Sequence, residues 1–590
     1  MHATSDDKAK KIELELSVVM SCHCAIRSVD HISDFLTKYG KGSDLEKIRL
    51  HRSKCACLLK NVIAPSLRDV LSENLSGKKF SLIVDESTDV SVSKNLCILV
   101  RYFNDHSQHV ETDLLALVPV TDATGEVLFQ EIEAVLHSFG QTFKNCIGFG
   151  ADGASSLVGK NNSVFSRILQ TNPKCILVKC ICHSLALAVK HACEKLMADV
   201  GFLVTEIPAW FSKSTLRRND FQKLSEVLNT GGDEQGTGSL PPFMKSSSTR
   251  WLTRGEVMKR IMDNWPELQA YFSLVESSGS FETRSKGRII LGMLKNPYTF
   301  LFFSFATPLI REVEKINKMF QAEKVDAEKQ CKELMAFHRT LRDRLFDQKG
   351  QPLALSNVDF GHDFEIELKK FLDHSSQQAN VKSEVASMKQ RCHDCLVELF
   401  NQVKVRLPDN IKLFNGLSFL SPNMVMSHDV HRAPLKHLPL SHLLNSEIEQ
   451  EYRSIPYHDW SADFPLGTPK DALEFWAAVA LLKNSVGEIK YPNLSHYALA
   501  CMTLPVSNAH VERVFSYVTW LKSKTRNRLQ LVMMEALLRI RMNLLTRGGC
   551  CKEFEASVDM LNRFSSSMYH KYSQSDDEMG EIDAIFDFQD

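Results

Sequence analysis

Three features that would place the chain in a specialised class are missing from its 590 residues. Net charge is the first, because 71 Lys and Arg residues balance 71 Asp and Glu residues. This balance excludes nucleic-acid binding through an overall excess of positive charge, although it does not exclude a local basic groove. A long apolar run is the second: none reaches the ~18 residues of a membrane span, and the nearest, Tyr298 to Leu309, contains polar residues and Pro308.

A secretory signal is the third, since residues 1–11 are polar and charged. The 16 cysteines also lack the spacing of a disulfide framework. Some are adjacent, such as Cys550 and Cys551, and others are one residue apart, such as Cys22 and Cys24. We therefore expect a reduced, intracellular compartment and no membrane partner.

The composition that is present, 44% hydrophobic and 24% charged, is that of a globular chain rather than a mostly disordered one. At roughly 100–200 residues per domain, the length predicts three to five domains. The first 78 residues have the apolar spacing of helices, and we find no internal repeat.

Short apolar runs rich in Val, Ile, Leu and aromatic residues begin at Phe80 and predict strands. Three strands come first, then a helix, a strand, a helix, a strand and a helix. This is the order of an RNase H-like fold, a mixed sheet with helices on both faces. The expected strands are residues 80–85, 96–103, 110–120, 145–149 and 175–182, and the expected helices are residues 126–139, 162–169 and a segment from Ser184.

Helical patterns dominate from about residue 200. Residues 573–590 carry seven acids but no Lys or Arg. The fold class expected is therefore α/β plus α, an RNase H-like domain interrupted by a large all-α insertion. The expected divisions are a helical N-terminal region (1–78), the first part of the RNase H-like domain (79–200), the helical insertion (201–485), the final part of that domain with a dimerisation region (486–548), and a tail (549–590) that is acidic from residue 576.

Two acids stand where an RNase H-like sheet would bring them together. Asp85 lies at the end of the first strand and Asp152 just past the end of the fourth, and these strands are neighbours in such a sheet. Two close carboxylates repel each other unless a cation is bound, and a pair of divalent ions would also activate phosphodiester chemistry. Taken alone, the acids fit the ordinary role of Asp in turns and helix caps better than a catalytic role.

Four sequence blocks resemble the hAT superfamily of DNA transposases. Residues 85–91 (DESTDVS) and 149–160 (FGADGASSLVGK) resemble its first two catalytic blocks, and Arg250-Trp251 resembles a motif of its inserted helical domain. The segment from Tyr491, through residues 505–516 (PVSNAHVERVFS), to Leu545 resembles its C-terminal dimerisation region. The blocks fall in the family's order across most of residues 30–545.

This resemblance implies a catalytic and metal-binding triad of Asp85, Asp152 and Glu512, with Mg²⁺ or Mn²⁺ as the cofactor. It also implies that Cys180 and His183 lie near the active site and help to handle DNA. Zinc is not expected, because one Cys-x-Cys-His without a second ligand pair is a weak signal. The pair Cys392 and Cys395 is assigned to packing in a helix for the same reason.

Further residues could contact DNA. Trp251 could stack on an unstacked base while Arg250 binds the adjacent phosphate, although a Trp in a helical core is the alternative. Basic residues follow the predicted Glu512 helix, and a second group could equally be a solvated helix face. The first group is Lys522, Lys524, Arg526 and Arg528, and the second is Lys213, Arg217, Arg218 and Lys223.

The helix expected from Leu529 to Leu545 has more apolar residues than one buried stripe needs, which indicates self-association or burial within the same chain. The residues chosen for dimerisation are Leu537, Leu538, Leu544 and Leu545. The zinc finger that usually recognises DNA ends in hAT transposases is not found before residue 79.

Two functional hypotheses follow. The first is a nuclear hAT transposase-like protein, acting as a dimer or higher oligomer, that cleaves DNA and transfers strands at a two-metal site. The second is a transposon-derived, non-catalytic, dimerising nuclear protein that acts in transcription or chromatin. The triad favours the first hypothesis; the missing finger and the acidic tail favour the second. The sequence alone leaves open whether the chain is an enzyme.

Overall fold

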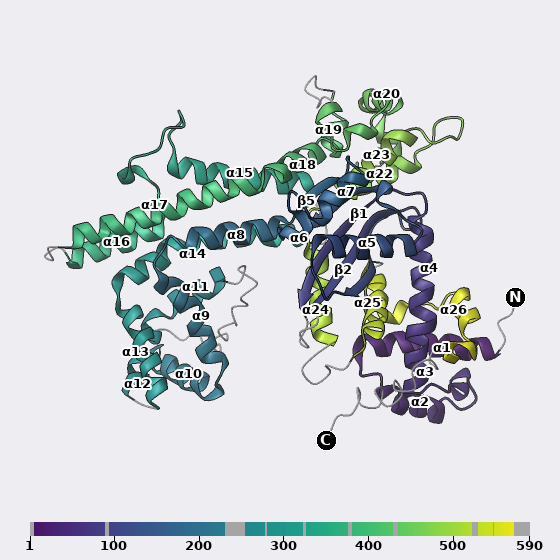
Figure 1. Cartoon of the computed structure of the whole chain (residues 1–590), viewed down its shortest axis with the longest axis horizontal. Helices are drawn as coiled ribbons and strands as arrows, with labels where there is room; N and C mark the ends of the chain where they lie inside the picture. The colour runs from purple at the N-terminus through teal and green to yellow at the C-terminus, as the bar shows by residue number, and fades with distance from the viewer. Residues whose placement is uncertain are drawn as a thin grey trace. The chain divides into compact units, whose positions relative to one another are not determined.

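The computed structural model divides the chain into two compact units (Figure 1). The first unit combines residues 1–180 with residues 416–590, and the second is residues 181–415. The described residues are 5–88, 94–229, 254–277, 280–322, 326–375, 380–428, 435–465, 467–521, 529–546 and 548–570.

A five-stranded sheet is the centre of the first unit, in the order β3-β2-β1-β4-β5. The pairs β1/β2 and β2/β3 are antiparallel, whereas β1/β4 and β4/β5 are parallel. This confirms the expected mixed sheet. The strands are β1 (Phe80–Thr88), β2 (Lys94–Asn104), β3 (His109–Pro119), β4 (Cys146–Ala151) and β5 (Ile176–Lys179).

Alternation along the strands gives the sheet two apolar faces. On one face, Phe80, Leu82 and Val84 of β1 pack with α4 (Ala64–Leu75), α5 (Gly125–Ser138) and α7 (Val164–Thr171). On the other, Ile83 packs with α24 (Ala509–Leu521) and α25 (Leu531–Thr546). The remaining elements here are η3 (Phe143–Asn145) and α6 (Ser155–Val158).

The N-terminal and C-terminal helices share one apolar core. The π-helical turn η2 contacts α1, α25, α26 and α27, and the core includes Met560, Phe564 and Met568. The expectation of a tail from residue 549 is therefore wrong up to residue 570, because these apolar side chains are buried; the acidic residues from 576 lie outside the described residues. The elements are α1 (Ser5–His23), α2 (Ser28–Tyr39), η1 (Asp44–Lys47), α3 (Arg52–Cys57), η2 (Leu58–Ile63), η9 (Cys551–Glu553), α26 (Val558–Arg563) and α27 (Ser567–His570).

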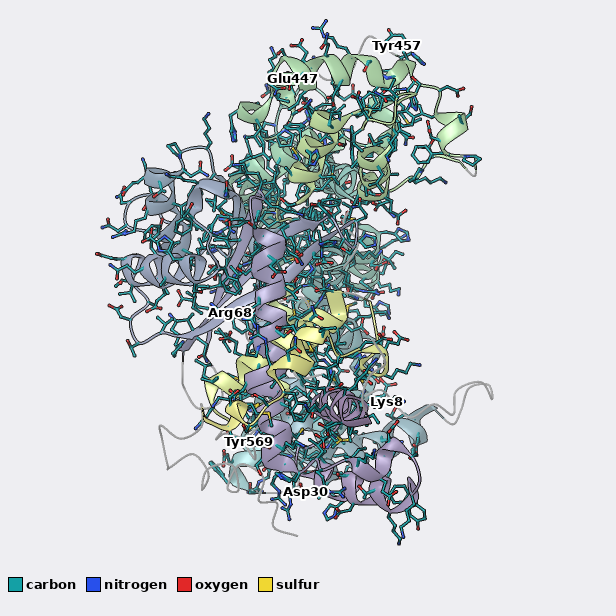
Figure 2. The ribbon with its side chains drawn as sticks, turned by 90° about the vertical axis from the view of Figure 1, so that its right-hand side faces the viewer. Lys8, Asp30, Arg68, Glu447, Tyr457 and Tyr569 are labelled. Atoms are coloured by element: carbon teal, nitrogen blue, oxygen red, sulfur yellow. The ribbon has the colours of Figure 1, made fainter. Side chains whose placement is uncertain are left out.

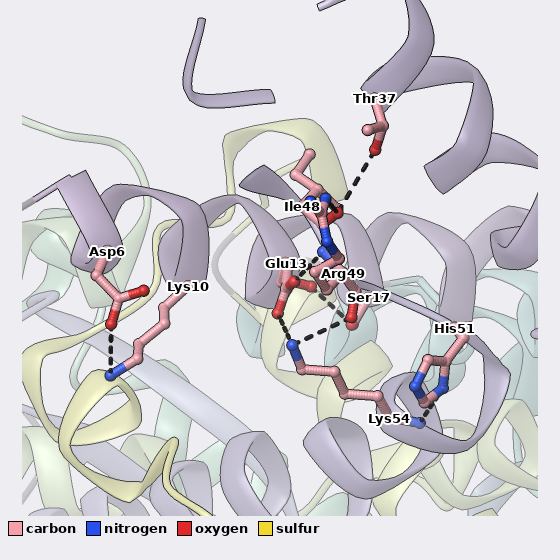
Figure 3. Close-up of polar contacts among 9 residues, drawn as sticks. All are labelled: Asp6, Lys10, Glu13, Ser17, Thr37, Ile48, Arg49, His51 and Lys54. Atoms are coloured by element: carbon pink, nitrogen blue, oxygen red, sulfur yellow. Dashed lines mark hydrogen bonds and ion pairs between the residues drawn. The ribbon is translucent and has the colours of Figure 1, made fainter. Parts of the chain in front are cut away.

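Polar contacts also hold the N-terminal helices together (Figure 3). Glu13 of α1 is 3% exposed; its carboxylate accepts a hydrogen bond from the Arg49 backbone N–H at 2.6 Å and pairs with Lys54 at 2.5 Å. In Figure 2, Lys8, Asp30 and Tyr569 lie toward one end of the first unit, and Glu447 and Tyr457 lie at the other.

Residues 416–485 also belong to the first unit, which corrects their expected place in the helical insertion. The cause is local packing: α22 contacts α23 and β3, and the Trp476 indole donates to the Leu420 carbonyl at 2.8 Å. The helices here are α19 (Pro422–Val425), η6 (Leu435–His437), η7 (Ser441–Leu443), α20 (Ser446–Ser454), η8 (Ile455–Tyr457), α21 (Trp460–Asp463), α22 (Ala472–Leu481) and α23 (Pro492–Met502).

The second unit begins at Ile181, earlier than the expected residue 201, because α8 packs against α14 and α17. Its described regular elements are helices: α8 (Ile181–Cys193), α9 (Ala198–Ser212), α10 (Thr215–Asn229), α11 (Arg254–Asp263), α12 (Trp265–Ser277), α13 (Phe281–Lys295), α14 (Pro297–Phe320), α15 (Ala327–Leu345), η5 (Leu355–Asn357), α16 (His362–Ser375) and α17 (Val381–Arg406), with α18 (Pro408–Ser418) at the boundary. Among the described helices none is by itself long and apolar enough to cross a membrane; one pair, α13 with α14, passes that test together but is bent by 72°.

Candidate active site

The ends of two parallel strands bring Asp85 and Asp152 to the same edge of the sheet. Val84 of β1 pairs with Ala151 of β4, so each acid is the residue that follows one member of this pair. Asp85 shares a face of β1 with Ile83, the face that α24 covers. Carboxyl ends of neighbouring parallel strands are the usual place for reactive groups in such folds.

The environment of Asp85 raises the pKa of its carboxyl group well above 3.8. Burial is the largest cause, the charge of Asp152 is the next that raises the pKa, and Cys180 and Glu512 add to it. The Glu86 backbone N–H donates to Asp85 Oδ1 at 2.8 Å and acts in the opposite direction. Both other members of the expected triad are therefore electrostatic neighbours of Asp85.

Helix α24 brings Glu512 to the sheet, although Glu512 lies 360 positions after Asp152 in the sequence. Val511, Val514 and Val518 of α24 are buried against β1 and β2. These residues lie just before and after Glu512 in the sequence, so they hold this part of the helix against the sheet. The Glu512 N–H donates to the Asn508 carbonyl at 3.1 Å, within the first turn. Apolar spacing along α24 thus fixes where the third acid lies.

Two glycines of β4 allow the chain to approach the sheet just before α24. A Cβ on Gly148 would lie 2.7 Å from Leu504 Cδ2, and one on Gly150 would lie 3.0 Å from Pro505 Cβ. Any larger residue would push this segment away from β4. The glycines therefore help to set the position of Glu512, although no local sequence pattern marked them for this role.

A partly buried cationic group near α24 was also missed. Arg101 of β2 donates to the Met502 carbonyl and to Thr112 Oγ1, both at 3.3 Å, and burial lowers its pKa to about 10. Burial, together with the charges of Arg101 and Arg513, lowers the pKa of His510 to about 3. The one available signal was an arginine in the middle of an apolar strand.

The alternative role of Asp152 as a turn residue is also present: its Oδ1 accepts the Ala154 N–H at 2.8 Å. Cys180 follows β5, and its N–H donates to the Ala151 carbonyl at 2.9 Å. His183 lies on α8, in the other unit. Cys392 and Cys395 are buried on α17, which agrees with their assignment to packing.

Six of the expected DNA-binding residues lie outside the described residues: Arg250, Trp251, Lys522, Lys524, Arg526 and Arg528. In the second basic group, the Arg217 guanidinium stacks 3.9 Å from the centre of the Trp210 ring. This contact uses one of the four cations for packing within the chain.

Burial within the chain accounts for most of the apolar surface of α25. Leu537 and Leu544 pack with the N-terminal helices, and Leu538 packs with the sheet. Of the four residues expected at a dimer interface, only Leu545 is exposed, at 46%. The other large exposed apolar residues on α24 and α25 are Trp520 and Val532.

A hard divalent cation suits the donors of this site, since carboxylate oxygens are the ligands that Mg²⁺ and Mn²⁺ prefer. Burial is the largest cause of the raised pKa of Asp85, and the nearby like charges that add to it are what such a cation would offset. Within the described part of the chain, however, no three His, Cys, Asp or Glu side chains form a ready-made metal site.

Two known domains match this chain, and each holds part of the candidate site. Residues 42–163 match the ZMYM1/FAM200 RNase-like domain, which here includes Asp85 and Asp152. Residues 454–544 match the hAT family C-terminal dimerisation region, which here includes Glu512. The chain therefore contains an RNase-like domain and a hAT C-terminal dimerisation region.

A curated relative is the mouse (Mus musculus) general transcription factor II-I repeat domain-containing protein 2. It is 26% identical over 220 residues, which cover 36% of this chain and 22% of that protein. The hAT resemblance seen in the sequence is thus confirmed, and the dimerisation region indicates that this hAT-related chain self-associates.

Proposed function

We propose that this hAT-related protein cleaves and transfers DNA phosphodiesters in the nucleus, with Asp85, Asp152 and Glu512 as the catalytic acids. The supporting observation is the raised pKa of Asp85, to which Asp152 and Glu512 both contribute from distant parts of the chain. Strongly perturbed carboxyl groups at a sheet edge are typical of functional sites. Bound divalent ions would supply charge neutralisation and an activated nucleophile for in-line attack on phosphorus.

The chain's own residues have separable roles in this proposal. Asp85 and Asp152 would provide ligands from the fixed edge of the sheet, where β1 and β4 are hydrogen-bonded in register. Glu512 would complete the ligand set from α24, at a position set by the Gly148 and Gly150 contacts with the Leu504–Pro505 segment. The DNA-contacting roles of Arg250, Trp251, Cys180, His183 and the basic segment at 522–528 belong to the same proposal.

Metal binding tests this proposal without knowledge of the DNA ends. Titration of the full chain with Mn²⁺, followed by calorimetry, should give saturable binding that Asp152→Asn and Glu512→Gln each weaken at least about tenfold. Asp122→Asn is the matched control, since Asp122 is an exposed acid of the same unit and is not among the charges that raise the pKa of Asp85. Equal Mn²⁺ binding by all four proteins would refute the metal site.

Cleavage is the second readout. With Mn²⁺, the wild type and Asp122→Asn should nick branched and hairpin DNA, and Asp152→Asn should not. Metal binding by the wild type with no cleavage on a broad panel of DNA structures would contradict the proposed activity while leaving the metal site intact.

A non-catalytic nuclear protein, dimerising and acting in transcription or chromatin, is the second candidate. Two observations favour it: the described residues contain no ready-made group of three metal ligands, and a relative is named as a transcription factor repeat protein. In that case Asp85→Asn and Glu512→Gln would leave both dimer mass and chromatin association unchanged, which light scattering and nuclear fractionation measure.

A further inference from the structure

The second unit contains an apolar pocket of about 340 Å³ between helices α8, α9, α11 and α14, which are labelled in Figure 1. Pockets that hold small molecules have volumes of about 300–1,000 Å³ and commonly lie between the helices of a bundle. This pocket contains none of the acids proposed for DNA chemistry. It is therefore independent of the proposed function.

Aliphatic side chains form most of the wall: Leu196, Met197, Val200, Val204, Met258 and Ile310. The described residues that line the pocket include no aromatic ring, amide or hydroxyl group. A nucleobase needs stacking surfaces and hydrogen-bonding partners, which this wall does not provide. Flexible aliphatic chains suit such a wall, because their burial needs only apolar contact.

Charged groups occupy a limited part of the wall. Lys190 of α8 and Arg254 of α11 are cationic, and Glu194 is the one acid among the described lining residues. The Glu194 carboxylate lies 3.4 Å from His191 Nδ1. Two cations against one carboxylate give the pocket a net attraction for an anionic group.

We propose that this pocket binds a medium-chain carboxylate, with the hydrocarbon chain along the aliphatic wall and the carboxylate at Lys190 and Arg254. Both requirements are met by the same ligand: burial of the chain gives affinity, and charge complementarity orients the head group. Each added methylene should tighten binding about fourfold until the pocket is full. Octanoate, decanoate and dodecanoate should thus differ by about fifteenfold per step.

Gly201 of α9 provides a way to fill the pocket without disturbing the fold. It lines the pocket, and a Cβ built on it meets no atom within 4 Å. Gly292 of α13 is a matched control, because its added Cβ also meets no atom within 4 Å. Both glycines are exposed on helices, so Gly201→Leu and Gly292→Leu gain similar helix propensity, but only the first fills the pocket.

Calorimetric titration of the full chain with dodecanoate tests the proposal. We expect one site, weakened at least about tenfold in Gly201→Leu and unchanged in Gly292→Leu. Lys190→Glu should weaken dodecanoate about tenfold, and the cationic analogue dodecyltrimethylammonium should bind the wild type more weakly than dodecanoate. Absence of binding, or equal binding by the two leucine variants, would overturn the proposal.

Cys193 reports on the same pocket independently, because it is one of the residues that line the wall. Bound dodecanoate should slow the alkylation of Cys193 by N-ethylmaleimide in the wild type and in Gly292→Leu, measured by mass spectrometry of the peptide. Dodecanoate binding with no protection of Cys193 would locate the ligand elsewhere and contradict the proposal.

Discussion

Asp85 and Asp152 follow the paired residues Val84 and Ala151, and the negative charge of Asp152 helps to raise the pKa of Asp85. Two carboxylates at adjacent strand ends oppose each other's ionisation, and burial adds to the cost of the charged form. Proteins retain such an arrangement mainly where a cation or a proton is part of the function. This relationship is the basis of the first prediction.

Asp85→Asn should stabilise the metal-free protein at neutral pH. A raised carboxyl pKa means that the folded state binds a proton more tightly than the unfolded state does. Stability is therefore lost as pH rises from the ordinary value near 3.8 through the raised folded value, and the loss persists at pH 7. Urea unfolding should show a higher free energy of unfolding for Asp85→Asn at pH 7 and similar values for both proteins at pH 3.

Addition of Mn²⁺ should reverse this order, because only the wild type gains stability from the ion. Asp122→Asn, at an exposed position, controls for the loss of one negative charge. A wild type that is more stable than Asp85→Asn at pH 7 without metal would contradict this prediction. It would show that folding does not disfavour the ionised form of Asp85.

Local sequence patterns predicted some features of this site but not others. The order of the predicted strands and helices indicated an RNase H-like sheet, and the acids at the ends of its first and fourth strands led to the prediction that Asp85 and Asp152 meet at one edge. The expected strand at residues 80–85 extends to Thr88 in the structure, and the expected strand at 175–182 shortens to Ile176–Lys179. Local patterns therefore located the elements but not their ends.

Long-range packing could not be predicted in the same way. Gly150 lies against Pro505, and His510 lies near Arg101. Both relationships depend on tertiary packing between residues that are about 350 to 400 positions apart in the sequence. The helices from residue 551 were expected to belong to a tail, and Met560, Phe564 and Met568 are in fact too few to form a core alone. Their partners lie in residues 14–67 and in α25.

Gly150→Val should destabilise the protein and displace α24. The new Cβ alone would lie 3.0 Å from Pro505, and the two methyl groups require more room, so the Leu504–Pro505 segment must move. Overpacking of this kind costs about 1–3 kcal/mol. Urea unfolding measures the loss, and NMR titration of the Asp85 carboxyl carbon should show a smaller upward shift of its pKa, because Glu512 moves away. Gly150→Ala should show both effects more weakly; an unchanged titration in both variants would mean that Pro505 does not position Glu512.

His510→Gln should make the protein less sensitive to acid. The pKa of His510 is lowered to about 3 by burial and by the charges of Arg101 and Arg513, against 6.5 in the unfolded chain. Between these values the unfolded state binds a proton that the folded state does not, so stability falls by up to about 1.4 kcal/mol per pH unit as the pH decreases. Glutamine cannot take up that proton, and the slope of the unfolding free energy between pH 6 and pH 4 should become shallower.

The exposed His496 of α23 is the matched control for this change. His496→Gln should leave the slope close to that of the wild type. Equal slopes for His510→Gln and the wild type would show that His510 is protonated in the folded protein.

Glu13→Ala should cost far more stability than Asp6→Ala, although both acids are on α1 and both pair with a lysine (Figure 3). The Glu13 side chain is 4% exposed and receives both Lys54, at 2.5 Å, and the Arg49 N–H, at 2.6 Å. Its removal leaves a largely buried cation and a backbone donor without their acceptor, which costs about 3 kcal/mol. The Asp6 side chain is 83% exposed and lies 3.8 Å from Lys10, and such surface pairs contribute less than about 1 kcal/mol.

Urea unfolding at pH 7 in 0.1 M and 1 M NaCl measures both variants. We expect the loss in Glu13→Ala to persist at high salt, since burial of the Glu13 carboxylate limits screening of the pair by ions. A loss that disappears in 1 M NaCl would place the Glu13–Lys54 pair among ordinary surface contacts.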